Sequence, residues 1–145
     1  MRSFVFSFAA LLCGAASFPV HAADAASYTM ADYAGVAKID VHLHLHDEAP
    51  AFTASAKAQN FKVLTINVDY PDFPPLDDQQ RVAIALKKQF PQDVAWVASF
   101  SVAGSDQPAW LAATRHRLAG STQAGAVGVK VWKNIGMDLR DSDKQ

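Results

Sequence analysis

The chain is poor in cysteine and in excess charge, and both shortages limit what it can do. Its 145 residues include one cysteine, Cys13, which cannot close an intramolecular disulfide or supply the paired thiolates of a structural zinc site. Its 13 basic side chains are balanced by 14 acidic ones, so the sequence lacks the basic footprint of a nucleic-acid-binding protein. A metal held by the chain would therefore need nitrogen and oxygen ligands.

A long apolar run is also missing, because the apolar segment from Phe4 to Phe18 is short for a membrane span. Arg2 precedes this segment and a Val-x-Ala sequence ending at Ala22 follows it, an order typical of a secretory signal peptide. We predict a signal peptide over residues 1–22 and export to the periplasm or the medium, without stable membrane insertion after cleavage. Cleavage after Ala23 and an uncleaved anchor or buried helix are the alternatives.

The rest of the chain alternates between strand and helix patterns. Residues 23–36 are small and polar and are expected to be a leader, and residues 37–145 are expected to form the folded domain. Strands are predicted at 38–46, 61–68, 94–101 and 126–132, and helices at 50–60, at 77–90 and from about Asp106 and Pro108 onward. This spacing indicates βα units with parallel strands, either in a doubly wound sheet or in a (β/α)8 barrel. No Gly-x-Gly-x-x-Gly sequence supports a dinucleotide-binding version.

The first predicted strand has the most informative pattern in the chain. Strict alternation places Ile39, Val41, Leu43 and Leu45 on one face and Asp40, His42, His44 and His46 on the other. Imidazoles crowded on one face are costly to bury without partners, and a divalent metal ion is a natural partner for them. The other interpretation is an exposed edge strand whose polar face is rich in histidine.

Position along this strand separates the roles of its polar residues. His42 and His44 lie toward the carboxyl end, where parallel α/β folds place catalytic groups, and two such imidazoles can bind one cation. His46 lies at or beyond the strand end, so we expect it at the rim or against a substrate. Asp40 could accept a hydrogen bond from a ligating imidazole or serve a structural role, and both alternatives stay open.

The fourth predicted strand repeats this logic. Gly128, Lys130 and Trp132 share the face of the histidines, while valines occupy the other face. Lys130 could bind a substrate carboxylate, carry a carbamate that acts as a metal ligand, or extend to the rim. Three residues are candidates for binding the substrate: His46, Asn67 at the end of the second strand, and Trp132.

Two segments carry a resemblance to a known family. The sequence Ile39-Asp40-Val41-His42-Leu43-His44 resembles the first-strand metal motif of the amidohydrolase superfamily. Residues 125–137, Gly-Ala-Val-Gly-Val-Lys-Val-Trp-Lys-Asn-Ile-Gly-Met, resemble the fourth-strand region of its amidohydrolase-related branch, and the likeness covers about residues 36–141. It implies a (β/α)8 TIM-barrel fold in which His42 and His44 bind a divalent metal, commonly zinc.

The resemblance also implies a reaction class. A metal-activated water would attack the amide, ester or lactone carbonyl of a small-molecule substrate. Non-oxidative decarboxylation on the same scaffold is the alternative, and Lys130 could then help clamp the carboxylate.

The length of the chain bears on the same expectation. A complete barrel needs about 250 residues, so we expect only the first four βα units, which make up the N-terminal half. The third alternative is an inert truncated fragment, because two histidines are fewer than the three protein ligands usual at catalytic zinc. By itself the chain is expected to be inactive.

Overall fold

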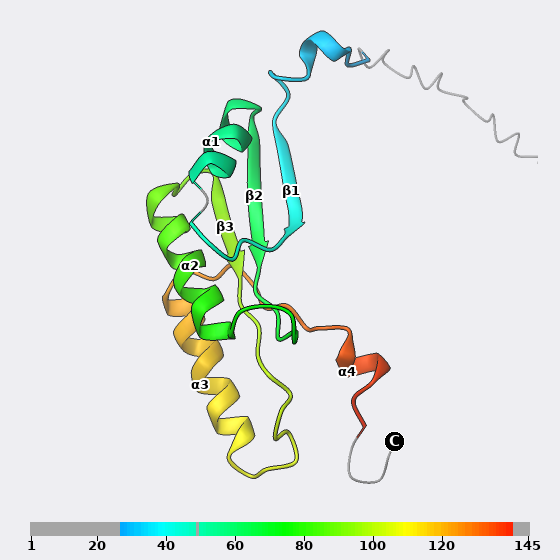
Figure 1. Cartoon of the computed structure of the whole chain (residues 1–145), viewed down its shortest axis with the longest axis vertical. Coiled ribbons are helices and arrows are strands. Elements are labelled where there is room, and N and C mark those ends of the chain that lie inside the picture. The colour runs from blue at the N-terminus through cyan, green and yellow to red at the C-terminus, as the bar shows by residue number, and fades with distance from the viewer. Residues whose placement is uncertain (1–26, 49, 141–145) are drawn as a thin grey trace, which may run out of the picture.

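The computed structural model describes residues 27–48 and 50–140 (Figure 1). The predicted signal peptide, residues 1–22, lies outside them, as does the first part of the predicted leader. The described leader contains a short 3-10 helix, η1, at Met30–Asp32, and runs directly into the first strand. Within the described residues, no helix combines the length and apolar character needed to cross a membrane.

The fold is mixed α/β, built on a parallel sheet. Its strands are β1 (Lys38–Leu43), β2 (Phe61–Ile66) and β3 (Val94–Val97), hydrogen-bonded in the order β1-β2-β3. Helix α1 (Pro50–Ala58) connects β1 to β2, and α2 (Leu76–Gln89) connects β2 to β3. Helices α3 (Trp110–Gln123) and α4 (Asn134–Met137) follow. The predicted βα alternation and parallel strands are confirmed.

Helix α2 shows why these residues form their elements. Asp77 and Asp78 lie in its first turn and Lys87 and Lys88 in its last, so the charges complement the helix dipole at both ends. Between them, one side of the helix is buried against the sheet at Val82, Ala83 and Leu86. Helix and sheet therefore form two packed layers, with α2 and α3 following one another along one side of the molecule (Figure 1).

The hydrophobic core lies between the sheet and α2. One buried cluster joins Val63, Val82, Leu86 and Val94, with Leu43, Leu45, Ala56 and Phe90 packed around it. A second cluster joins Ala83, Trp96 and Ala98. Full burial of an aliphatic side chain stabilises a fold by about 1.5–3 kcal/mol, so these residues fix the sheet against the helix.

The strict alternation expected along β1 is wrong, because the pairing register shifts within the strand. Asp40 pairs with Val63, whereas Leu43 pairs with Thr65, so three steps along β1 match two along β2. The shift brings Leu43 to the helix side of the sheet but also leaves Asp40 on that side, in a small hollow against α1. Ile39 and Val41 are instead 66% and 60% exposed.

The expected fourth strand is also only partly formed. Within the described residues, the 126–132 segment pairs with the end of β3 through a single parallel bridge, Ala98 to Val129. Three backbone hydrogen bonds hold it there, and Gly128 lies close to Val97. Val127, Val129 and Val131 remain 46–65% exposed, so little apolar burial stabilises a longer ladder.

The start of the third helix also differs from expectation. Asp106 and Pro108 lie in a series of turns, and α3 begins only at Trp110, with Ala109 as its N-cap and no capping side chain. Backbone turns close this segment, through bonds such as that from the Gln107 N–H to the Gly104 carbonyl. The loop between β3 and α3 is therefore longer than the sequence suggested.

Candidate metal centre

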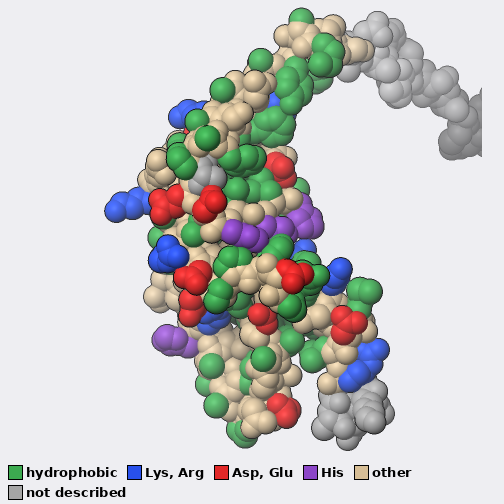
Figure 2. Space-filling model, viewed as in Figure 1, with side chains coloured by type: hydrophobic (Ala, Val, Ile, Leu, Met, Phe, Trp, Pro, Cys, Tyr) green, Lys and Arg blue, Asp and Glu red, His purple; other side chains and the backbone are tan. Residues whose placement is uncertain are grey.

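His42, His44 and His46 form a row at the carboxyl end of β1, which we call the histidine row. The rings of His42 and His44 meet edge to face with centroids 5.6 Å apart, and those of His44 and His46 are 6.4 Å apart. Figure 2 shows histidine side chains gathered in a band across one face of the molecule. The structure therefore brings the three predicted imidazoles together.

His44 is held in the orientation that a metal ligand requires. Its Nδ1–H donates to the carbonyl oxygen of Ile66, the last residue of β2, at 2.7 Å. A carbonyl oxygen can only accept, so in the neutral ring the lone pair lies on Nε2. Histidines that bind metals usually donate their second ring N–H to a carbonyl or carboxylate in this way. His44 thus presents Nε2 as a ready ligand atom.

The His46 side chain is partly buried. Its Nε2 atom is buried and has no hydrogen-bond partner among the described residues. Burial lowers the pKa of His46, the nearby His44 lowers it further, and Asp47 opposes both effects. The ring therefore favours the neutral state, which is also the state that can bind a metal.

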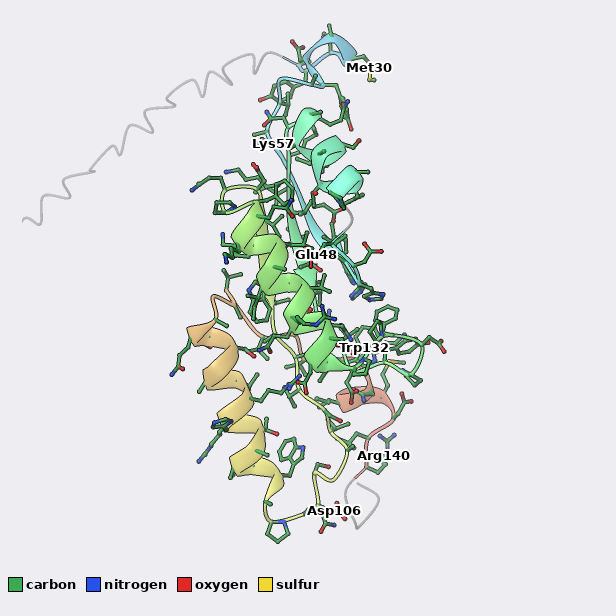
Figure 3. All side chains as sticks on the ribbon, turned by 60° about the vertical axis from the view of Figure 1, so that its left-hand side comes forward. Met30, Glu48, Lys57, Asp106, Trp132 and Arg140 are labelled. Atoms are coloured by element: carbon green, nitrogen blue, oxygen red, sulfur yellow. The ribbon has the colours of Figure 1, made fainter. Side chains whose placement is uncertain are left out.

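A line of aromatic side chains, which we call the aromatic line, runs from the histidine row to the 126–132 segment. It consists of Phe73, Tyr70 and Trp132. The centroid of the Phe73 ring lies 4.4 Å from that of His46 and 5.0 Å from that of His44. The centroid of the Tyr70 ring lies 5.4 Å from that of Phe73 and 5.7 Å from that of Trp132. Figure 3 shows Trp132 beside the loop that connects β2 to α2.

The aromatic line connects the histidines to Lys130. The Lys130 ammonium lies 6.0 Å from the centre of the Trp132 ring, within range of a weak cation–π attraction. The backbone of Lys130 is anchored to the residues that directly follow β3, because its N–H donates to the Ala98 carbonyl and its own carbonyl accepts from the Ser99 hydroxyl. Its side chain remains partly buried, so its predicted roles toward a carboxylate or a metal stay predictions.

Gln79 holds the loop that carries Phe73 and Tyr70. This side chain is 1% exposed, and its amide accepts from the Val68 N–H and donates to the Val68 and Pro74 carbonyls. Both ends of the β2–α2 loop are therefore fastened to the first turns of α2. We call these three hydrogen bonds the Gln79 clamp. The clamp fixes the position at which the aromatic line contacts the histidines.

The remaining predicted residues lie apart from this cluster or contribute little surface to it. Asn67 is 2% exposed, with its backbone N–H bonded to Val97, so its part in substrate binding stays a prediction. Asp40 accepts a hydrogen bond from the His42 backbone N–H at 3.0 Å and faces α1. Its placement fits the structural role rather than support of a ligating imidazole.

The number of candidate ligands is small. Among residues 27–48 and 50–140, no group of three or more histidine, cysteine, aspartate or glutamate side chains is close enough together to hold a metal ion. His42 and His44 fit the nitrogen chemistry that zinc accepts, and His46 is the next nearest imidazole. The described residues thus fit two ligands of a zinc site, one fewer than catalytic sites usually have.

Sequence reasoning missed Phe73, Tyr70 and Gln79. The Tyr-Pro-Asp-Phe-Pro-Pro run that contains Tyr70 and Phe73 indicates only a chain-breaking loop, and Gln79 resembles any polar residue in a helix. A usable signal was the position of this loop directly after the second strand. Loops at the carboxyl ends of parallel strands converge on one edge of the sheet.

Comparison with protein-family models found no match for the chain. Comparisons with curated proteins and with solved structures likewise found no match.

Proposed function

We propose that His42 and His44 bind a divalent metal ion, zinc foremost, in a metal-dependent hydrolase that is exported from the cell. The reaction would be attack of water on an amide, ester or lactone carbonyl of a small molecule. The observation that carries the proposal is the 2.7 Å hydrogen bond from His44 Nδ1 to Ile66, which leaves Nε2 as the ligand atom.

The chemistry of the proposal follows from what the neighbouring side chains can do. A bound divalent ion supplies Lewis acidity and a water of lowered pKa. His42 and His44 would hold it at the carboxyl edge of the sheet. Phe73, packed on His44 and His46, shields the imidazoles from bulk water. The proposal requires at least one further ligand, because catalytic zinc usually has three protein ligands and no group of three lies close enough together among the described residues.

A second candidate reaction is metal-dependent, non-oxidative decarboxylation. The observation that favours it is Lys130, whose ammonium lies beside Trp132 at the far end of the aromatic line. A carboxylate that leaves as CO2 needs a cationic clamp, and flat side chains suit a flat substrate. The products distinguish the two reactions, because decarboxylation releases CO2 and hydrolysis does not.

Zinc titration of the chain by calorimetry tests the ligand assignment directly. We expect His42→Ala and His44→Ala each to weaken zinc binding by at least about tenfold, the usual effect of losing a ligand or its support. His116→Ala is the matched control, because His116 is an exposed histidine on α3 and should leave the affinity unchanged. Equal zinc affinity in the wild type and in the His42→Ala/His44→Ala double variant would contradict the assignment.

Turnover separates the hydrolase from the inert alternative. Zinc-dependent hydrolysis of an activated ester that disappears in His44→Ala would support the hydrolase. Stoichiometric zinc binding without any turnover would favour the third interpretation, in which the chain binds metal but is inert by itself.

A further inference from the structure

A second hollow lies away from the histidine row, between α2, α3 and the segment that follows β3. We call it the Arg117 groove. Its volume is about 600 Å³, and the residues that define its chemistry are Gln80, Phe100, Trp110, Thr114, His116 and Arg117. None of the histidine row or the aromatic line contributes to its lining.

Arg117 is the centre of this groove. Its Nη1 donates to the Asp77 carboxylate, yet its Nε is buried without a partner among the described residues. A guanidinium matches the two oxygens of a carboxylate, and the Arg117 side chain, which is 26% exposed, lines the groove.

The charges of the lining favour an anion in the groove. Ser121 Oγ lies 2.8 Å from Gln80 Oε1 and 3.0 Å from the Arg117 carbonyl oxygen, which holds the Gln80 amide beside Arg117. Among the described residues that line the groove there is no aspartate or glutamate. The neighbouring hollow of about 330 Å³ on the other side of Arg117 contains Asp69 and Asp77, which repel an anion. The charges therefore favour the groove over that hollow.

The apolar part of the groove is aromatic. Phe100 and Trp110 meet edge to face with ring centroids 6.1 Å apart. The Trp110 indole N–H donates to the Ser101 carbonyl at 2.9 Å, which fixes the orientation of the ring. A preformed aromatic pair beside a guanidinium favours a ligand with both a flat apolar group and a carboxylate.

We propose that the Arg117 groove is an accessory binding site for a small organic carboxylate with a flat apolar body. The carboxylate pairs with the guanidinium of Arg117, and the flat group packs against Phe100 and Trp110. The site needs no metal and no residue of the histidine row, so it stands or falls independently of the proposed hydrolase.

Benzoate and its neutral analogue benzamide are the probes. In ¹H–¹⁵N spectra of the chain, benzoate should shift the Arg117 Nε–H and the Trp110 indole N–H saturably, and should bind about tenfold or more tightly than benzamide. Equal shifts with the two probes, or no saturable shift up to about 10 mM benzoate, would overturn the proposal.

Three variants assign the binding to the guanidinium edge. Arg117→Gln should weaken benzoate by about tenfold, and Arg117→Lys should also weaken it, because lysine keeps the charge but lacks the forked donors. Asp77→Asn is the matched control: it removes the ion pair but keeps the Arg117 guanidinium, so the affinity for benzoate should stay the same or rise. The buried Trp96 indole signal reports whether each variant is folded. Wild-type affinity in Arg117→Lys, or equal losses in Asp77→Asn and Arg117→Gln, would contradict the site.

Discussion

The two faces of the parallel sheet have opposite characters. The helix side carries Val63, Val94 and Trp96, each at most 4% exposed and packed under α2. The other side carries Ile39 at 66% exposure and, beyond the register shift, the histidine row. One face therefore carries the buried core, and the other carries the proposed metal ligands. The same strand, β1, serves both because its register shifts by one residue.

The largest expected effect tests the packed face. Leu86 is fully buried between α2 and the sheet, so Leu86→Ala should lower the free energy of unfolding by about 2–5 kcal/mol. Urea denaturation at constant pH measures the change. The histidine row lies on the other face, so the remaining folded protein should keep its zinc affinity.

Leu111→Ala on α3 is the matched control, because this leucine is 50% exposed. We expect its effect on unfolding to be within about 1 kcal/mol. If both leucine variants lost the same stability, the helix side could not be the source of the fold's stability. A large loss of zinc affinity in Leu86→Ala would show that the two faces are coupled.

The next effect tests the connection between the faces. Gln79 extends from α2 to the loop that carries the aromatic line, and Gln79→Leu would leave the fully buried Val68 N–H and carbonyl without partners. We expect a loss of about 1–3 kcal/mol in unfolding free energy. We also expect changed chemical shifts at His44 and His46, because Phe73 moves with the loop.

Gln89→Leu provides the control on the same helix, at an exposed position in its last turn. It should change neither the free energy of unfolding nor the chemical shifts of His44 and His46. Gln79→Glu would place a buried carboxylate against the Val68 and Pro74 carbonyl oxygens, so it should be at least as destabilising as Gln79→Leu. Unchanged histidine shifts in Gln79→Leu would mean that the clamp does not position the aromatic line.

Much of this arrangement follows from the sequence, since hydrophobic periodicity and chain breakers are local signals. The alternation after position 41 correctly places Leu43 and Leu45 toward the helices and the histidines on the other face. The Val82 and Leu86 spacing correctly predicts the buried side of α2. These features depend on residues close in sequence, so pattern alone is enough.

The missed features depend on contacts between distant segments. The shift between Asp40 and Leu43 is set by pairing with β2, and nothing in the local alternation marks it. Gln79 contacts Val68 across 11 positions, and Arg117 contacts Asp77 across 40. Such contacts require the topology first, so composition and periodicity cannot reveal them.

The smallest expected effect is a dependence on pH. The pKa of His46 in the folded chain lies below its ordinary value of 6.5, mainly because of burial. As the pH falls through 6.5, the unfolded chain takes up the proton before the folded chain does. The free energy of unfolding should therefore decrease below that pH, and the decrease should level off once folded His46 is also protonated.

Urea denaturation of the wild type and of His46→Gln across this pH range isolates that contribution. The wild type should lose more stability than the variant as the pH falls. Parallel pH profiles would show that the burial of His46 has no consequence for its protonation.

The central claim is that His42 and His44 hold a metal, and that the bond from His44 Nδ1 to Ile66 leaves His44 Nε2 as a ligand atom. Long-range ¹H–¹⁵N spectra of the histidine rings, recorded with and without zinc, test it most directly. Before zinc is added, His44 should be protonated on Nδ1. Zinc should then shift the resonance of His44 Nε2 and the ring resonances of His42. It should leave the ring resonances of the exposed His116 unchanged. If zinc left the His44 resonances unchanged, or shifted those of His116 to the same extent, the histidine row would not be a metal site.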